Sequence, residues 1–192
     1  MDRRRIRLLI AGLSAGLCAT SAAITASSAA TPDANAACGP AAMNASDAEA
    51  AMLALRAHNA ERASLNLPPL AWNCRLAQEA AKWAEALSQQ GKLQHASAEI
   101  RKGSGENLWM GTAGHWSVDR MVGMFIDERQ HYRHGPFPDV SRTGNWSDVG
   151  HYSQIIWRDT RELGCALVQG REQEVLVCRY FPAGNVMGRT AY

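Results

Sequence analysis

The sequence predicts an α+β fold, because helical and strand patterns occupy separate parts of the chain. Apolar residues recur at helical spacing most regularly between Asn73, which can cap a helix, and Gly91, which ends it. Near the C-terminus, two β-prone segments, residues 164–169 and 174–181, are separated by a short turn, as in a hairpin. The chain has 192 residues, of which 46% are hydrophobic and 20% charged, and this suits one globular domain with a short appendage.

Residues 1–30 are predicted to be a secretory signal peptide. Arginines at positions 3, 4, 5 and 7 precede an apolar stretch over residues 8–24, which is too short and too rich in Ala, Gly and Ser for a membrane span. Small residues permit cleavage after Ala30 or after Ala36, and we favour the first site; an uncleaved N-terminal anchor is the alternative. Residues 31–46 then form a loose lead-in, and residues 47–192 form the folded domain.

Loss of the signal peptide changes the charge of the chain. Four arginines and Asp2 leave, so Lys+Arg falls from 20 to 16, Asp+Glu falls from 18 to 17, and the formal net charge changes from +2 to −1. The basic excess belongs to the signal peptide, so nucleic acid is not expected as a partner. We expect a secreted, extracellular protein, or a periplasmic one in a bacterium, that is not an integral membrane protein after signal removal.

A first helix is expected from Ser46 or Asp47, either of which can cap it, to about Leu65. One side of this helix carries Met52, Leu55 and Asn59, with His58 and Arg62 beside them. Residues 66–69 break it, and residues 70–72 form a short apolar link before the helix that Asn73 caps.

The middle of the domain alternates loops with short elements. Their predicted order is a loop (92–105) containing His95, an extended segment (105–109), a helix from Ser117 to about His131, a loop (134–148), and a helix from near His151 to Asp159 or Thr160. Met121, Phe125, Glu128 and Tyr132 lie at spacings of four, three and four on the helix that Ser117 caps. A carboxylate on this otherwise apolar face is costly unless it is paired or bound to a cation, so Glu128 is predicted to have a partner.

Four cysteines remain in the mature chain, and an even number in an exported chain indicates two disulfides. If the C-terminal strands pair across their four-residue turn, Cys165 and Cys178 lie directly opposite each other. Opposed Cβ atoms of an antiparallel pair are about 4.5–5.5 Å apart, within adjustment range of a disulfide. We therefore predict a Cys165–Cys178 disulfide and, by elimination, Cys38–Cys74; the alternative is one disulfide and two free thiols.

Four motifs follow one another along the domain. They are residues 58–62 with 69–72 (HNAER and PLAW), residues 105–108 (GENL), residues 150–160 (GHYSQIIWRDT) and residues 175–186 (VLVCRYFPAGNV). Together they resemble the CAP superfamily of cysteine-rich secretory, antigen 5 and pathogenesis-related proteins, also called SCP-domain proteins. The resemblance spans about residues 47–188 and implies a three-layer α-β-α sandwich with a small central antiparallel sheet.

The same resemblance implies a cleft with two histidines and two glutamates, which match His95, Glu106, Glu128 and His151. His95 lies in a loop that carries no strict pattern. His58 belongs to the first-helix motif, which in the family is more often structural.

Two imidazoles in one cleft suit Zn²⁺ or another divalent cation, with water completing the coordination. We therefore expect His95 and His151 to be metal ligands, although no metal is obligatory. Glu106 and Glu128 are then candidate general bases that orient the water or accept its proton. The alternative is a polar network that uses no metal. Ser153 lies two residues after His151, so on a helix the two do not face each other, and Ser153 is expected to be structural.

The family that the sequence resembles is tied to sterol or fatty-acid binding and to interactions at cell surfaces. We therefore predict a protein that acts mainly by binding a lipid or a cell-surface protein partner. A metal-dependent, peptidase-like hydrolase is the alternative, and a scaffold recognised by another protein is a third, because one fold supports many activities. Candidates to line an apolar groove, if they are not ordinary core residues, are Trp109, Met110, Trp116 and Phe137.

Overall fold

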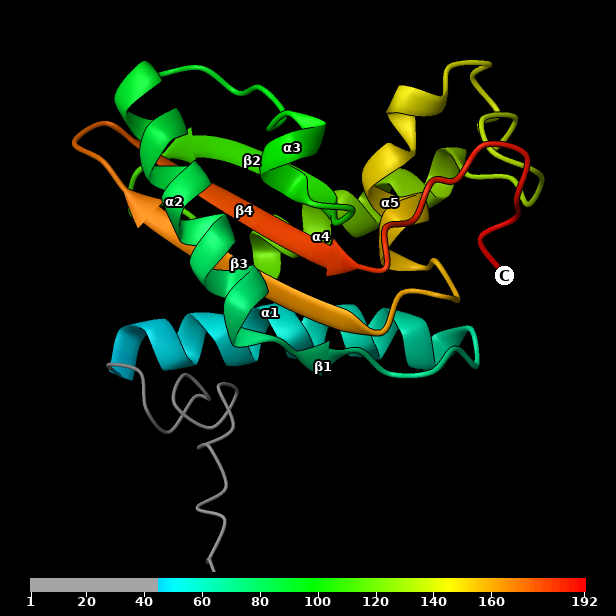
Figure 1. Cartoon of the computed structure of the whole chain (residues 1–192), viewed down its shortest axis with the longest axis horizontal. Coiled ribbons are helices and arrows are strands. Elements are labelled where there is room, and N and C mark those ends of the chain that lie inside the picture. The colour runs from blue at the N-terminus through cyan, green and yellow to red at the C-terminus, as the bar shows by residue number, and fades with distance from the viewer. Residues whose placement is uncertain (1–44) are drawn as a thin grey trace, which may run out of the picture. The chain divides into compact units, whose positions relative to one another are not determined.

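The computed structural model describes residues 45–192, which form three layers (Figure 1). Helix α2 (Cys74–Gln90) packs on one face of a four-stranded sheet. Helices α1 (Ala45–Ser64), α4 (Val118–Asp127) and α5 (Gly150–Ile155) pack on the other face. This confirms the predicted α-β-α sandwich. The predicted signal peptide, and the lead-in as far as residue 44, lie outside the described residues.

The sheet is antiparallel except at one edge. Its strands are β1 (Ala71–Trp72), β2 (Gly105–Thr112), β3 (Glu162–Gln169) and β4 (Gln173–Phe181), in the order β1-β3-β4-β2. β4 pairs antiparallel with both of its neighbours, whereas β1 pairs parallel with the start of β3. The predicted apolar link therefore contributes a short edge strand. Its partner lies about ninety residues further along the chain, beyond the reach of a local sequence pattern.

The β3–β4 hairpin has the predicted register. Gln169 pairs with Glu174, and Cys165 lies opposite Cys178, with which it forms a disulfide. This confirms the first predicted disulfide. The second, Cys38–Cys74, stays a prediction, because Cys38 lies outside the described residues; Cys74 is buried at the start of α2.

Helix α2 begins and ends at its predicted capping residues. The Asn73 side chain accepts a hydrogen bond from the backbone N–H of Leu76, at 3.1 Å. At the other end, Gly91 adopts a left-handed conformation with φ of 63°, and its N–H donates to the Leu87 carbonyl. A residue with a side chain would be strained at this φ, so glycine suits the end of the helix.

Helix α1 agrees with the predicted bounds, and its buried side carries polar residues. Met52 is 58% exposed, so the side that carries it does not face the sheet. The buried side combines alanines with three polar residues, His58, Glu61 and Arg62, of which His58 and Arg62 have no exposed surface. Small alanines let the helix approach the sheet closely, and the polar side chains find partners there, as described below.

The later helices are shorter than predicted. Helix α4 ends at Asp127 and continues as a 3-10 turn, η3 (Glu128–His131), to the predicted end. Helix α5 ends at Ile155, before the predicted Asp159 or Thr160. The Arg62 guanidinium accounts for this early end, because it donates to the carbonyls of Ile155 and Trp157. Two further turns lie within the predicted loops, α3 (Ala98–Arg101) and η4 (Trp146–Asp148).

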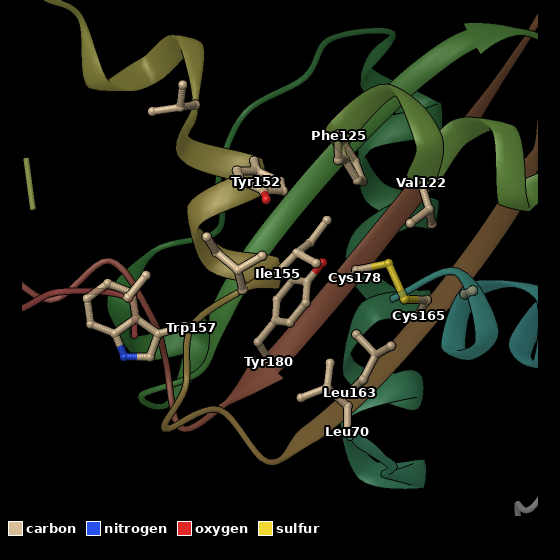
Figure 2. Close-up of a cluster of buried hydrophobic side chains, with 14 of the residues drawn as sticks. Leu70, Val122, Phe125, Tyr152, Ile155, Trp157, Leu163, Cys165, Cys178 and Tyr180 are labelled. Carbon is tan, nitrogen blue, oxygen red and sulfur yellow. A yellow bond between two sulfur atoms is a disulfide. The ribbon is translucent and has the colours of Figure 1, made fainter. Parts of the chain in front are cut away.

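The sheet separates two apolar clusters. Figure 2 shows the larger one, in which Cys165, Cys178 and Tyr180 of the sheet pack beneath Phe125 of α4 and Ile155 of α5. On the opposite face, alanines and a leucine of α2 pack on aliphatic residues of β2 and β4. No helix within residues 45–192 has the length and apolar character needed to cross a membrane.

Candidate functional site

The four predicted site residues form two histidine–glutamate pairs. His95 Nδ1 lies 2.7 Å from Glu106 Oε1, and His151 Nδ1 lies 2.5 Å from Glu128 Oε1. The side chains of His95 and His151 are 59% and 32% exposed, against 0% for Glu106 and 18% for Glu128. Each pair therefore places a buried or half-buried carboxylate behind a more accessible imidazole.

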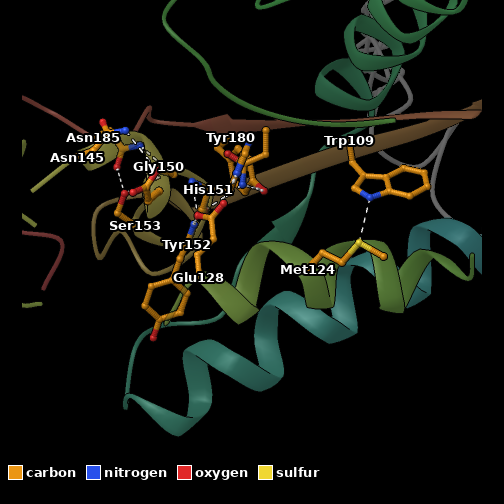
Figure 3. A network of polar contacts seen from close by, with 12 residues as sticks. Trp109, Met124, Glu128, Asn145, Gly150, His151, Tyr152, Ser153, Tyr180 and Asn185 are labelled. Atoms are coloured by element: carbon orange, nitrogen blue, oxygen red, sulfur yellow. Dashed lines mark hydrogen bonds and ion pairs between the residues drawn. The ribbon is translucent and has the colours of Figure 1, made fainter. Parts of the chain in front are cut away.

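Glu128 fixes the start of helix α5 as well as the His151 ring (Figure 3). Its Oε2 accepts hydrogen bonds from the backbone N–H groups of His151 and Tyr152, each at 3.0 Å. A carboxylate at the first turn of a helix stabilises N–H groups that have no partner within the helix. Phe125 stacks on the His151 ring with centroids 4.6 Å apart. Glu128, which lies in η3 directly after α4, thus has the partner that its place on the predicted apolar helix face requires.

Glu106 is held on three sides. Its Oε1 accepts hydrogen bonds from His95 and from the backbone N–H of Ala96, the latter at 3.0 Å. Its Oε2 forms a 2.9 Å ion pair with Nη2 of Arg179, a fully buried residue of β4. Burial lowers the pKa of Arg179, and the nearby Glu106 carboxylate opposes that shift. Glu106 is therefore an anchored carboxylate rather than a free one.

These contacts leave the same nitrogen available on both histidines. An ionised carboxylate only accepts hydrogen bonds, so Nδ1 of each histidine carries the proton and Nε2 keeps its lone pair in the neutral ring. Within residues 45–192, neither Nε2 has a hydrogen-bond partner. Carboxylates orient metal-binding histidines in the same way, so the donor chemistry fits a divalent cation.

No hydrogen bond or ion pair joins one pair to the other within the described part of the chain. The same residues contain no group of three or more His, Cys, Asp or Glu side chains that would hold a metal ion. A cation would therefore have at most two protein nitrogens, with water as the remaining ligands.

Strand β2 contacts both pairs at consecutive positions. Glu106 holds His95, and the Asn107 side chain donates 3.1 Å to the backbone carbonyl of His151. The side chains of Glu106 and Asn107 leave the strand on opposite faces, so the surroundings of both histidines depend on the position of this one strand. Asn107 also donates 3.0 Å to the Tyr180 hydroxyl.

His58 of α1 extends the hydrogen-bond network of Asn107 and Tyr180. Its Nδ1 lies 2.8 Å from the Ala54 carbonyl and its Nε2 lies 2.8 Å from the Tyr180 hydroxyl. Burial lowers the pKa of His58 to about 4, and the nearby Arg62 charge adds to this effect. Both ring nitrogens are occupied, which agrees with a structural role for this histidine.

Sequence reasoning did not single out Asn107, Tyr180 or Glu61. Asn107 belongs to the GENL motif and directly follows a predicted site residue, and this adjacency was the available signal. Glu61 accepts a 2.9 Å hydrogen bond from the Tyr152 hydroxyl and forms an ion pair with Arg129. Burial, followed by the hydrogen bond to Glu61, raises the pKa of Tyr152.

Ser153 and the predicted groove residues have structural surroundings. Ser153 is buried, with Oγ 2.7 Å from Oδ1 of Asn185. Trp109 donates to the Met124 sulfur on one face of the sheet (Figure 3), whereas Met110 packs in the cluster on the α2 face. Phe137 is buried in the core. Trp109 and Met110 therefore lie on opposite faces of the sheet, as neighbouring strand residues do, and their contacts agree with the alternative of ordinary core packing.

An apolar groove of about 510 Å³ lies elsewhere, along the outer edge of β3. β1 pairs with the first two residues of β3, and no other strand within residues 45–192 pairs with this edge beyond Leu163. The groove is lined mainly by small and aliphatic side chains of α1, α2 and β3, among them Ala50, Ala51, Ala77, Ala81, Ala166 and Leu167.

Sequence comparisons identify relatives of this chain. A family model described as "Cysteine-rich secretory protein family" (CAP) matches residues 55–180. Pathogenesis-related protein 1C of Nicotiana tabacum is 34% identical over 139 residues, which are 72% of this chain and 78% of that protein. Secreted protein RBT4 of Candida albicans is 34% identical over 146 residues, which are 74% of this chain and 37% of that protein.

Solved structures with the same fold include "NaASP2 with Zn2+", at a TM-score of 0.65 and 27% identity, covering 75% of this chain and 85% of that one. BmVAL-1 has a TM-score of 0.63 at 23% identity, with 75% and 82% covered, and shows the fold alone. The described disulfide fits an oxidising, extracellular compartment, as do the names of the relatives. The family model covers most of the domain and agrees with the motifs and the three-layer fold; the chain therefore belongs to the cysteine-rich secretory protein family.

Proposed function

We propose that this chain is an exported binding protein whose His95 and His151 hold a divalent cation such as Zn²⁺ through their Nε2 atoms. One observation carries the proposal: both imidazoles are oriented by a carboxylate at Nδ1, and neither has a partner at Nε2 within residues 45–192. A relative of this fold was crystallised with Zn²⁺, which supports the choice of cation.

The glutamates act behind the histidines in this proposal. Glu106 and Glu128 fix the tautomer and the ring orientation and raise the basicity of Nε2. A bound cation would supply Lewis acidity toward a ligand or water in its open positions. Two nitrogen ligands make a weak site, so we expect modest affinity and an exchangeable metal.

Hydrolysis is the less favoured alternative. It requires Glu106 or Glu128 to accept a proton as general base. Each carboxylate is already occupied, Glu106 by an N–H group and an arginine and Glu128 by two N–H groups. Protonation would weaken these bonds, so the contacts favour binding. Hydrolytic activity that disappears in both Glu106→Gln and Glu128→Gln would reverse this preference.

Zinc binding is testable by calorimetric titration of the unmodified protein, of His95→Ala and of His151→Ala. We expect heat of binding and a rise in melting temperature for the unmodified protein, and loss of both in either variant. His115→Ala is the control, because His115 is exposed and pairs only with Trp116. Absence of binding, or binding that survives both substitutions, would refute the metal proposal.

Binding of a fatty acid or sterol is a second candidate function, supported by the groove along β3. Its apolar lining and its volume of about 510 Å³ suit part of an acyl chain. Ala81→Glu places a charge in the groove, and Ala86→Glu makes the same change on α2 outside it. We expect a fluorescent fatty acid to lose affinity only for Ala81→Glu. Equal affinity for both variants would exclude this groove as the site.

A further inference from the structure

Asn107 lies at the junction between the two halves of the candidate site. It is buried, and its amide nitrogen donates both to the His151 carbonyl and to the Tyr180 hydroxyl. One residue before it, Glu106 holds His95. No other residue of β2 contacts helix α5 through a side-chain hydrogen bond within the described chain.

The hydrogen bonds from Asn107 through Tyr180 to His58 all have a defined direction, because the carbonyl oxygen at the end of the series can only accept. The Ala54 carbonyl only accepts, so His58 Nδ1 carries the proton and Nε2 accepts from the Tyr180 hydroxyl. The Tyr180 oxygen must then accept from Asn107, which identifies the atom facing it as the amide nitrogen. The second N–H of that nitrogen donates to the His151 carbonyl. The depressed pKa of His58, about 4, keeps its ring neutral, as this order requires.

His151 is consequently held at both ends of its backbone. Glu128 accepts from its N–H and from its ring Nδ1, while Asn107 donates to its carbonyl from the opposite side. Helix α5 has only six residues, so its own hydrogen bonds restrain the start of the helix weakly. The position of the His151 ring therefore depends on these two outside contacts, together with the stacked Phe125.

We propose that Asn107, supported by Tyr180 and His58, is a positioning residue for His151. Other contacts hold α5 at Gly150, Ser153 and Ile155, but among the described side chains Asn107 is the one that donates to the His151 carbonyl. The consequence for metal binding rests on the proposed function, but the positioning of the ring does not.

The test compares Asn107→Leu with Leu87→Ala, a buried α2 residue of the other core cluster that contacts neither histidine. Leucine has the same branched arrangement of side-chain heavy atoms as asparagine but is bulkier and has no donor, and Leu87→Ala controls for the loss of stability. In metal-free protein, long-range ¹H–¹⁵N spectra report the His151 ring, and amide exchange reports the His151 and Tyr152 N–H groups. We expect Asn107→Leu to move the His151 ring signals, to accelerate exchange of both amides about tenfold, and to weaken Zn²⁺ binding about tenfold, as expected for loss of an outer contact at a metal ligand.

Tyr180→Phe is a milder companion, because it removes one hydroxyl and keeps the ring in the core. We expect the same changes at His151, smaller in size, while the His95 signals stay in place. Unchanged His151 ring and amide signals in both Asn107→Leu and Tyr180→Phe, beside a stability loss like that of Leu87→Ala, would overturn the positioning role. Shifted His151 signals without Zn²⁺ binding to the unmodified protein would support positioning and refute the metal proposal instead.

Discussion

Arg62 and His58 are buried polar side chains of α1 that form hydrogen bonds to the elements carrying the candidate site. Arg62 has no exposed surface, and none of the carboxylates in residues 45–192 pairs with it. Four backbone carbonyls surround its guanidinium instead, those of Pro68, Ile155, Trp157 and Thr160. Burial lowers the pKa of Arg62 to about 10, and Arg161 and Arg158 add to the shift. The planar fork of the guanidinium joins α1 to the end of α5 and the chain that follows it.

Replacement of Arg62 by lysine keeps the charge but removes the fork. A lysine has one nitrogen and cannot reach four carbonyls, so buried acceptors lose their donors. We expect Arg62→Lys to lower the free energy of unfolding by about 3 kcal/mol, measured by urea denaturation. Arg171→Lys, in the exposed hairpin turn, should change it by less than about 0.5 kcal/mol. Equal effects of the two variants would contradict this account.

His58 makes stability depend on pH. The unfolded chain binds a proton at this residue below about pH 6.5, but the folded chain does so only near pH 4. Between these values the unfolded state binds more protons, so stability is complete above pH 6.5 and falls as the pH drops toward 4. The shift corresponds to a loss of about 3 kcal/mol.

The measurement is the free energy of unfolding between pH 4 and pH 7 for the unmodified protein and for His58→Gln. We expect a flatter pH dependence in the variant, whatever its stability at neutral pH. The exposed His115→Gln should retain the original slope. Parallel curves for the unmodified protein and His58→Gln would disprove the assignment.

Among the elements, α2 and β3 meet most closely at Gly164. A Cβ there would lie 2.2 Å from the Ala77 nitrogen and 2.7 Å from the Asn73 carbonyl oxygen. Backbone atoms cannot give way as a flexible side chain does, so the first turn of α2 would have to leave the sheet. This close approach brings the buried start of α2 against the hairpin.

Gly164→Ala is therefore expected to lower the free energy of unfolding by about 2–3 kcal/mol. Gly123→Ala makes the same chemical change in the middle of α4, where the added Cβ meets only the flexible end of Arg120, at 3.6 Å. We expect that variant to gain about 0.5–1 kcal/mol from helix propensity. The measurement is the free energy of unfolding of both variants by chemical denaturation. A Gly164→Ala protein as stable as the unmodified one would contradict the close contact between α2 and β3.

Some secondary-structure elements were predictable from the sequence and others were not. Helix α2 and the hairpin were predictable, because caps, apolar spacing and opposed cysteines are local or nearly local signals. The end of α5 and the pairing of β1 with the sheet were not predictable. They depend on Arg62 and on the start of β3, which lie far away along the chain. Family motifs identified the site residues. The pairing of each histidine with its glutamate depends on how the elements approach one another.

At the scale of the whole molecule, the proposed export predicts that the four cysteines outside the predicted signal peptide are all oxidised. Non-reducing peptide mapping should recover Cys165 with Cys178, as the structure has them, and Cys38 with Cys74, as the sequence predicts. Alkylation of Cys38 and Cys74 in protein that has not been reduced would contradict the second pairing. A Cys38→Ser variant should then leave one thiol, at Cys74, that labels only after unfolding, because Cys74 is buried.

The Cys165–Cys178 link has a consequence for register. β4 lies between β3 and β2, and its consecutive residues Arg179 and Tyr180 serve Glu106 and Asn107 on opposite faces. A slip of one residue would exchange those faces, separating Glu106 from its cation and Asn107 from its acceptor together. The disulfide joins β4 to β3, so β4 cannot slip past β2 unless β3 moves with it. Because β3 also packs against α2, the disulfide makes such a slip require the movement of a whole hairpin away from the helix. A chain in which these two cysteines stay reduced lacks this covalent restraint.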